Sequence, residues 1–442
     1  MKKLLTSLSL LAGVTTLVAC SSDKTEQAPS ADSNEKQELV TTIENPVTIE
    51  FWHAMSGTNQ EAVDALVEQF NTTIGAEKGI TVESVYQGAY TDLKTKTTAA
   101  LKSGSAPAIT QAYTDWVAEY LQSGAVVALD EYINDPEVGI KDFDDIIKDY
   151  RAENSQYEGG KFYSLPFNKS TEVLYYNKTF FDANGLTVPT TWDEVEEVSA
   201  KIKELTGNPA FGVDSPQNYF ITMVQQFGGQ YTNSQGEILF SEDNAKAAIE
   251  TLELLKRNTD AGLWRLPGED KYLSGPFMSE LLYMYTGSTA GYSHISTAPF
   301  EVGVAPIPQI SSETGAVIQQ GTNVVVLNQN KSAEEVYAAY EFAKFLSSYE
   351  ANLFFATNTS YLPIRQSVMD SAEYQAYVTE SGDQTKLVGP EQSAYYFYDP
   401  AFYTDTFSSY NVRTAVGNAV ESVVLSGVSP EQAVEEALNA LK

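Results

Sequence analysis

Residues able to carry out catalysis are scarce in this chain. His53 and His294 are its only histidines, and the patterns His-Glu-x-x-His and Gly-x-x-x-x-Gly-Lys-Ser/Thr are absent. The segment 287–291, Gly-Ser-Thr-Ala-Gly, has its serine at the wrong position for a nucleophile elbow. His53 ends the first apolar run and is expected to be a hydrogen-bonded structural residue rather than a base. We therefore expect no enzymatic activity, no cofactor and no metal.

Carboxylate pairs are the remaining candidates for catalysis, because two acids suffice for glycoside hydrolysis. Asp144 and Asp145 form such a pair, but the chain has 59 Asp and Glu residues, so adjacent acids arise by chance. The acids between Glu194 and Glu197 are typical of a solvated helix face. A secreted glycosidase, and an adhesin that binds no small molecule, stay open as alternatives.

Aromatic residues and arginines are the better candidates for binding. The chain has 27 Tyr, whose flat apolar body and polar tip suit the wall of a sugar or polyol site. Arginines are few, and a guanidinium is the expected partner of a phosphate. Arg413 lies among hydroxyl residues, ahead of a predicted apolar helix over 415–424.

The net charge excludes one class of partner. The chain has 27 Lys and Arg, most of them scattered singly, and a formal charge of −32. A nucleic acid requires a basic stripe, so we expect no nucleic-acid binding. The acidity is typical of the solvated surface of a secreted protein.

The N-terminus predicts export. Two lysines precede a short apolar run over 8–19, which is typical of a signal peptide over residues 1–19. The run ends in Leu-Val-Ala-Cys, which resembles the bacterial lipobox, so Cys20 is expected to be lipidated. Cys20 is the only cysteine, which excludes disulfides within the chain. Residues 20–46 are mostly polar and are expected to form a flexible tether.

The folded part begins with alternating strands and helices. Strands are predicted over 47–52, 80–86 and 108–113. Helices are predicted after Thr58, which has Glu61 at the spacing of a capping box, and through Leu93 to Gly104. This order predicts an α/β fold with a mostly parallel sheet and a ligand crevice at the carboxyl ends of the strands.

A similar alternation restarts after Pro166 and suggests a second lobe. Strands are predicted over 173–176, 283–285, 302–305 and 323–327. Helices are predicted from Trp192, over 333–346, and from Pro430. Thr191 with Glu194, and Ser429 with Gln432, have the spacing of helix caps.

Six segments of the chain resemble one family. It is similar to the extracellular solute-binding proteins of ABC importers, which include maltose-binding proteins, and within them to the glycerol-3-phosphate binders of Ugp importers. The segments are 51–55 (Phe-Trp-His-Ala-Met), 86–90 (Tyr-Gln-Gly-Ala-Tyr), 105–109 (Ser-Ala-Pro-Ala-Ile), 166–171 (Pro-Phe-Asn-Lys-Ser-Thr), 174–178 (Leu-Tyr-Tyr-Asn-Lys) and 360–364 (Ser-Tyr-Leu-Pro-Ile).

The resemblance implies a set of ligand-binding residues. Arg413 would pair with a phosphate, while hydroxyls and a backbone N–H would bind its oxygens or a polyol. The residues carried over are Tyr90, Ser170, Ser288, Gly321, Tyr361 and Arg413.

Two positions depart from the family pattern. Thr114 replaces an acid that accepts a glycerol hydroxyl, and Asp115 beside it is a candidate substitute. Tyr219 and Phe220 are candidates to replace tryptophans that wall the site. We therefore expect glycerol 3-phosphate or a phosphodiester such as glycerophosphocholine. The alternative is a carbohydrate, with Tyr219, Phe220 and Trp264 stacking on sugar rings.

The resemblance also implies a two-lobed periplasmic-binding-protein fold that closes on its ligand. The expected crossings lie near residues 165, 290 and 347, which gives lobe one as 47–165 plus 291–347 and lobe two as 166–290 plus 348–442. The closed form would dock on the ABC permease. We expect a monomer, lipid-anchored at the extracellular face of the membrane, on a Gram-positive surface.

Overall fold

The computed structural model describes residues 39–241 and 244–442. The predicted signal peptide, Cys20 and residues 21–38 of the expected tether lie outside the described residues. Residues 39–46 were expected to belong to the tether, but Leu39, Val40 and Ile43 pack against buried hydrophobic residues. The backbone N–H of Glu44 also donates to Glu334 Oε1 at 2.8 Å. These residues are therefore part of the folded unit, because their apolar side chains have a surface to cover.

The described residues alternate between helices and strands along nearly their whole length. In chain order the elements are β1 (Val47–His53), α1 (Thr58–Thr72), α2 (Ile74–Lys78), β2 (Ile80–Tyr86), α3 (Tyr90–Ser103), β3 (Ile109–Ala112), α4 (Thr114–Leu121), α5 (Asp130–Ile133), η1 (Phe143–Asp145), α6 (Lys148–Asn154), η2 (Glu158–Gly160), β4 (Leu165–Asn177), α7 (Lys178–Asn184), α8 (Trp192–Thr206), β5 (Phe211–Val213), α9 (Pro216–Gln226), α10 (Lys246–Asp260), β6 (Trp264–Arg265), η4 (Gly268–Asp270), α11 (Ser274–Met278), β7 (Met284–Ser288), η5 (Thr289–His294), β8 (Val302–Ala305), β9 (Val317–Val326), α12 (Ala333–Leu346), α13 (Tyr349–Asn358), α14 (Gln366–Met369), α15 (Ala372–Ser381), α16 (Thr385–Glu391), η6 (Ser393–Tyr395), β10 (Tyr396–Phe397), α17 (Ser409–Leu425) and α18 (Pro430–Asn439).

The strands join in one sheet with the order β2-β1-β3-β9-β4-β7-β5-β6. The pairs β1–β2 and β1–β3 are parallel, as predicted, and so are β5–β6 and β5–β7. The expectation of a mostly parallel sheet is wrong at its centre, where β9 pairs antiparallel with both β3 and β4, and β4 pairs antiparallel with β7. The reason is that β4 and β9 are long strands that return through the sheet, rather than short strands of successive βαβ units.

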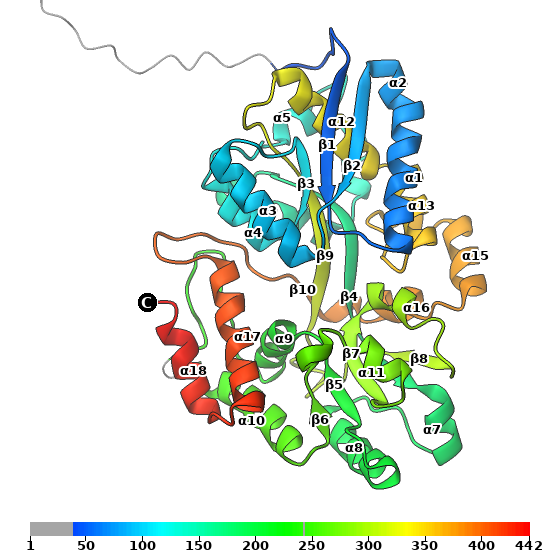
Figure 1. The fold of residues 1–442 in the computed structure, drawn as a ribbon, viewed down its shortest axis with the longest axis vertical. Coiled ribbons are helices and arrows are strands. Elements are labelled where there is room, and N and C mark those ends of the chain that lie inside the picture. Colours follow the sequence, from blue (N-terminus) through cyan, green and yellow to red (C-terminus); the bar gives the residue numbers. More distant parts are fainter. Residues whose placement is uncertain (1–38, 242–243) are drawn as a thin grey trace, which may run out of the picture. The chain divides into compact units, whose positions relative to one another are not determined.

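Two large clusters of buried hydrophobic side chains lie at opposite ends of these long strands. The first core gathers residues of β1, β2, α1 and α12, and takes Leu165 and Phe167 from β4. The second core gathers residues of α8, α9, α10 and α17, and takes Leu174 from β4. Figure 1 shows β4 and β9 running between these two groups of elements.

The cores divide the chain at points that differ from the expected lobe boundaries. Val317 and Ile318 of β9 belong to the second core, although residues 291–347 were assigned to lobe one. Phe355 and Tyr361 belong to the first core, although they follow the expected crossing near residue 347. The chain passes between the cores within β9 itself, because a single continuous strand supplies apolar residues to both.

Helix starts were predicted with mixed success. The predicted caps at Thr191 and Ser429 are present: Thr191 forms a capping box with Glu194, and Ser429 accepts from Gln432 N at the start of α18. The predicted cap at Thr58 is wrong, because Thr58 is the first residue of α1 and Gly57 is the N-cap, whose carbonyl accepts from Glu61 N at 3.1 Å. The apolar helix expected over 415–424 begins earlier, at Ser409, so that Arg413 lies inside α17.

His53 is fully buried and hydrogen-bonded, which confirms its predicted structural role. The Met55 N–H donates to Nδ1 at 3.2 Å, and Nε2 lies 2.9 Å from the Ser84 hydroxyl. Burial lowers the His53 pKa to about 4, so the ring is neutral near pH 7.

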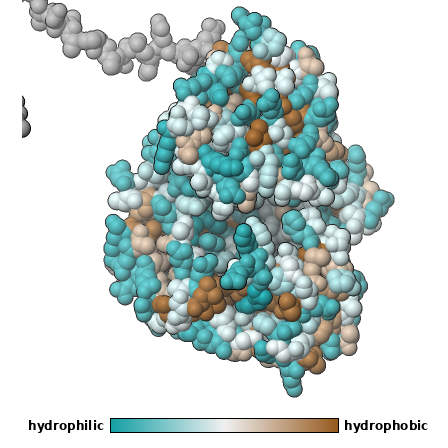
Figure 2. Space-filling model, viewed as in Figure 1, coloured by the Kyte–Doolittle hydropathy of each residue, from teal (hydrophilic) through white to brown (hydrophobic). Residues whose placement is uncertain are grey.

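The visible surface is mostly hydrophilic, with hydrophobic residues gathered in small patches (Figure 2). Among the described helices, none has the length and apolar character needed to cross a bilayer. The described residues also contain no group of three or more His, Cys, Asp or Glu placed to hold a metal ion.

Candidate functional site

The centre of β4 carries polar side chains between the two cores. Asn168, Ser170 and Glu172 alternate along the strand, so their side chains share one face of the sheet. All three are at most 6% exposed. Buried polar groups destabilise a fold unless they are hydrogen-bonded, so each of the three requires a partner. We call these residues the polar row.

At one end of the polar row, Asn168 binds Tyr90, whose hydroxyl in turn contacts Tyr361. Its Nδ2 donates to the Tyr90 hydroxyl at 3.1 Å, and the Tyr90 hydroxyl lies 3.2 Å from that of Tyr361. Gln111 Nε2 donates to Asn168 Oδ1 at 3.0 Å and fixes the orientation of the amide. Burial raises the pKa of both tyrosines, so their hydroxyls stay protonated and can donate. We call Asn168, Tyr90 and Tyr361 the hydroxyl end.

In the middle of the row, two serines meet from different strands. Ser288 at the end of β7 donates to the Ser170 hydroxyl at 3.1 Å, and its own oxygen accepts from Ala290 N at 3.2 Å. The structure therefore brings together the two serines that the family resemblance selected.

Gly321 lies on β9 directly beside the polar row. Its φ is +93°, in the region that favours glycine, and it pairs with Lys169 of β4. A Cβ atom at this position would lie 2.0 Å from Asn168 O and 2.7 Å from Lys169 Cα. Only glycine lets β9 approach β4 this closely.

At the other end of the row, Glu172 leads to Arg413. Glu172 Oε1 accepts from Asn218 Nδ2 at 3.2 Å and from Gln320 Nε2 at 3.0 Å. Asn218 Oδ1 in turn accepts from Arg413 Nη2 at 2.7 Å, and Arg413 Nη1 donates to Asp399 Oδ2 at 2.6 Å. The Arg413 side chain is 24% exposed. We call Glu172, Asn218, Arg413 and Asp399 the charged end.

Carboxylates outnumber guanidinium groups at the charged end. Burial raises the pKa of Glu172 to about 7 and that of Asp115 to about 6, and Arg413 offsets part of both shifts. Burial also raises the pKa of Asp399, which Arg413 partly offsets. Asp214 interacts electrostatically with Glu172, and burial raises its pKa to about 6. Asp399 Oδ1 and the Tyr231 hydroxyl are buried and have no hydrogen-bond partner. The charged end therefore has oxygen atoms that could still accept hydrogen bonds.

Thr114 and Asp115 begin α4, and each is 7% exposed. The Thr114 carbonyl accepts from the Tyr157 hydroxyl at 3.2 Å. Asp115 interacts electrostatically with Arg413, which places it beside the charged end.

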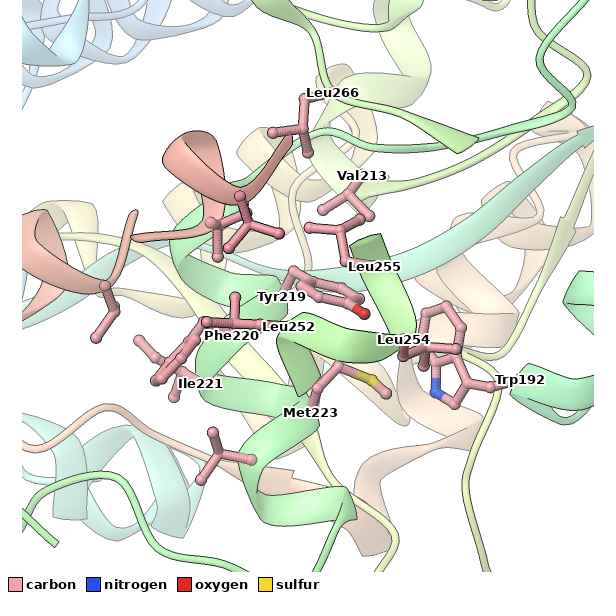
Figure 3. Close-up of a cluster of buried hydrophobic side chains, with 14 of the residues drawn as sticks. Trp192, Val213, Tyr219, Phe220, Ile221, Met223, Leu252, Leu254, Leu255 and Leu266 are labelled. Carbon is pink, nitrogen blue, oxygen red and sulfur yellow. The ribbon is translucent and has the colours of Figure 1, made fainter. Parts of the chain in front are cut away.

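Tyr219, Phe220 and Trp264 are buried in the second core. Figure 3 shows the first two among the buried hydrophobic side chains of this core. The Tyr219 hydroxyl donates to Thr251 O, and Trp264 Nε1 donates to Ser199 Oγ, both at 3.2 Å. Successive residues of a helix point about 100° apart, so the turn of α9 that aims Asn218 at Glu172 directs the next two residues, Tyr219 and Phe220, into the core. In this arrangement, the three rings pack in the core and are not placed to stack on a ligand.

Sequence reasoning missed four residues that connect the site: Asn168, Glu172, Asn218 and Asp399. Asn168 lies inside the segment 166–171 that carries the family resemblance. The alternation of Asn168, Ser170 and Glu172 was a readable signal of one polar strand face. Asn218 and Asp399 had no such signal, because only tertiary packing places them beside Arg413.

The chain is similar in sequence to known binding proteins. The model of a bacterial extracellular solute-binding protein family matches residues 65–379. The sn-glycerol-3-phosphate-binding periplasmic protein UgpB of Salmonella typhimurium is 26% identical over 412 residues, covering 89% of this chain and 91% of that protein.

Solved structures of two binding proteins share the fold. UgpB from Mycobacterium tuberculosis, in complex with glycerophosphocholine, superposes with a TM-score of 0.78 at 21% identity, covering 90% of this chain and 98% of that chain. The GacH receptor of Streptomyces glaucescens, studied with acarbose, superposes with a TM-score of 0.76 at 21% identity and the same coverage. Both are binding proteins of the two-lobed type. The chain therefore belongs to the bacterial extracellular solute-binding protein family, as a solute-binding protein of an ABC importer.

Proposed function

We propose that the protein captures a glycerophosphodiester, such as glycerophosphocholine, and delivers it to the permease of an ABC importer. The observation that carries this proposal is the charged end, where one partly exposed guanidinium lies near the Tyr231 hydroxyl and an excess of buried carboxylates. Arg413 would bind the phosphate through charge-assisted hydrogen bonds. Tyr90, Ser170, Ser288, Tyr361 and the Gly321 backbone would bind the glycerol and phosphate oxygens.

The charges favour a phosphodiester over a phosphate monoester. A monoester carries a charge of about −1.5 to −2 at pH 7, whereas a diester carries a single negative charge. Asp115, Glu172, Asp214 and Asp399 would repel the more highly charged ligand, even though the raised pKa values of the first three reduce this repulsion. A choline group would add a positive charge that these carboxylates attract. Glycerol 3-phosphate is the second ligand of this class.

A carbohydrate is the alternative, and one observation favours it. Both Nη atoms of Arg413 already bind protein groups, Asp399 and Asn218. A neutral ligand would leave this arrangement intact, and its hydroxyls could donate to carboxylates such as Asp399 Oδ1. In this case Arg413 would be structural. The likeness to the acarbose receptor is compatible with this alternative.

We propose that binding closes two lobes built around the two cores. The polar row lies where β4 and β9 pass from one core to the other, so ligand groups would come from both sides. Tyr90 and Asp115 would come from the side of the first core, and Asn218 and Arg413 from the second. Because a ligand would touch both sides only in the closed form, the closed population would follow ligand occupancy. The permease would then recognise the closed form.

Thermal melting tests the ligand. A ligand at about 100 times its dissociation constant adds about 2.7 kcal/mol to the free energy of unfolding. We expect glycerophosphocholine to raise the melting temperature more than glycerol 3-phosphate, and inorganic phosphate to have little effect. Arg413→Ala should abolish the shift. A shift with oligosaccharides only would support the alternative, and no shift with any of these compounds would refute both.

Membrane attachment is a separate proposal. The lipobox-like sequence that ends at Cys20 supports lipid anchoring at the extracellular face of the membrane, on a Gram-positive surface. We also propose that the protein is a monomer. Cys20→Ser should release the protein from the membrane fraction, and mass spectrometry of the wild-type N-terminal peptide should detect a diacylglyceryl group. Retention of Cys20→Ser in that fraction would contradict the proposal.

A further inference from the structure

Three helices that carry predicted ligand residues also carry a second set of polar residues one turn away. Lys94 follows Tyr90 by four positions on α3, and Glu119 follows Asp115 by four positions on α4. Tyr410 precedes Arg413 by three positions on α17, whose N-cap is Ser408. Residues three or four apart lie on one face of a helix, so the two sets are neighbours.

The second set contacts itself across the three helices. Lys94 Nζ lies 2.7 Å from Glu119 Oε2, and the Ser408 hydroxyl donates to Glu119 Oε1 at 2.6 Å. Lys94 Nζ also lies 3.3 Å from the centre of the Tyr410 ring, within the range of a cation–π interaction. Both oxygens of Glu119 are therefore engaged. Lys94 and Glu119 are 13% and 20% exposed, so water screens their attraction less than on an open surface.

These contacts connect parts of the chain that pack around different hydrophobic clusters. Leu93 of α3 and Val117 of α4 belong to a cluster that also includes Val325 of β9, whereas Val412 and Val416 of α17 belong to the second core. Tyr410 packs against the former cluster although its helix packs in the latter. Figure 1 shows the start of α17 close to α4, and the two helices are in contact.

We infer that Lys94, Glu119, Ser408 and Tyr410 form a latch that holds α17, and with it Arg413, in the ligand-binding arrangement. The inference rests on the proposed lobe closure. The latch touches no ligand and acts by position. The apparent affinity of a binding protein falls in proportion to the fraction of molecules in the binding-competent form, so interactions made only in that form tighten binding without any further group touching the ligand.

Ser408 has two roles in the latch. Its hydroxyl oxygen accepts from Asn411 N as the N-cap of α17, while its proton is donated to Glu119. The start of the helix that presents Arg413 is thereby fixed to α4, which presents Asp115. Loss of Glu119 leaves the cap itself in place, so Glu119 can be changed without removing the start of α17.

The test combines affinity with a distance measurement. Lys94→Met keeps the aliphatic stem and removes the charge, and Glu119→Gln keeps the shape of the side chain. Lys246→Met is the matched control, because Lys246 pairs with Glu250 on an exposed surface of α10.

Calorimetry and stopped-flow dissociation would use glycerophosphocholine. Spin labels at Glu68→Cys and Glu253→Cys, in the full chain with Cys20→Ser, would report the distance between α1 and α10 by electron–electron resonance.

We expect each latch variant to bind about 10-fold more weakly, through faster dissociation, while the control binds like wild type. The ligand-free variants should show a longer and broader label distance than wild type, with the melting temperature nearly unchanged. Double substitution with Tyr410→Leu should add little to Lys94→Met, because both remove one contact. Superimposable distance distributions in wild type and variants would overturn the latch. If wild type binds no glycerophosphocholine, the proposal for the ligand is refuted. The distance measurement on the ligand-free proteins still tests whether the latch holds α17 in place.

Discussion

At the hydroxyl end of the polar row, neutral groups hydrogen-bond to one another, whereas at the charged end a buried carboxylate connects through an amide to an ion pair. Neutral hydrogen bonds are individually worth about 1 kcal/mol, and the loss of one is tolerated. Buried charges behave differently. An unpaired buried charge lowers the free energy of unfolding by several kcal/mol, or the group shifts its pKa and becomes neutral. Hydrogen bonds therefore set the geometry along the whole row, whereas pH and ligand charge act at one end.

The largest effect should come from a change where β9 approaches β4, beside the polar row. Gly321→Ala would place a methyl group 2.0 Å from the carbonyl oxygen of Asn168, at a φ of +93°. We expect a loss of about 4 kcal/mol or more in the free energy of unfolding, measured by urea denaturation. Gly275→Ala is the control, since no atom lies within 4 Å of the added Cβ. Equal stability of the two variants would show that β9 does not need its close approach to β4.

Breaking the ion pair should have the next largest effect. Arg413→Met would leave Asp399 without its partner, and we expect a loss of about 3 kcal/mol in the free energy of unfolding at pH 8. Adding Asp399→Asn should recover more than half of this loss, because the uncompensated charge is removed. A loss below about 1 kcal/mol in the single variant would mean that water compensates Asp399, as at an exposed ion pair.

A smaller effect should depend on pH. The Glu172 pKa is raised from 4.5 to about 7, so between these values the folded protein keeps a proton that the unfolded chain has lost. The contribution of Glu172 to stability therefore falls as pH rises through this window. Glu172→Gln should remove that dependence. The free energy of unfolding of the variant, relative to that of wild type, should therefore rise by about 2 kcal/mol from pH 5 to pH 7.

Urea denaturation of both proteins at the two pH values measures this difference. Titrating groups that do not interact with Glu172 contribute equally to both proteins and cancel. Exposed Glu68→Gln should show no such gain. Parallel pH curves for wild type and Glu172→Gln would contradict the raised pKa.

The smallest effect should lie at the hydroxyl end. Tyr90→Phe removes one neutral hydroxyl that contacts Tyr361 and Asn168, and we expect a loss of about 1 kcal/mol in the free energy of unfolding, with no change between pH 5 and pH 8. Affinity for glycerophosphocholine should fall about 5- to 10-fold. If Tyr90→Phe destabilises the protein as much as Arg413→Met, the two ends do not differ in the way described.

The sequence alone determined the local elements and the family. The alternation of strands and helices, the caps at Thr191 and Ser429, and the segments 51–55 and 166–171 are readable because they depend on nearby residues. The resemblance also selected Tyr90, Ser170, Ser288 and Tyr361, which the structure brings to the same polar row.

Only the tertiary structure decided how the charged end is built. Arg413 and Asn218 are 195 residues apart, and Glu119 and Ser408 are 289 residues apart, so no local pattern links them. The antiparallel pairing of β4 and β9 likewise follows from the return of the chain between two cores, not from the pattern of either strand. On α9, Asn218 points to Glu172 and Tyr219 into the core, because helix rotation and packing fix which neighbour faces the site. Sequence specifies such contacts only through the fold as a whole, because the packing of both cores decides which residues distant in the chain lie side by side.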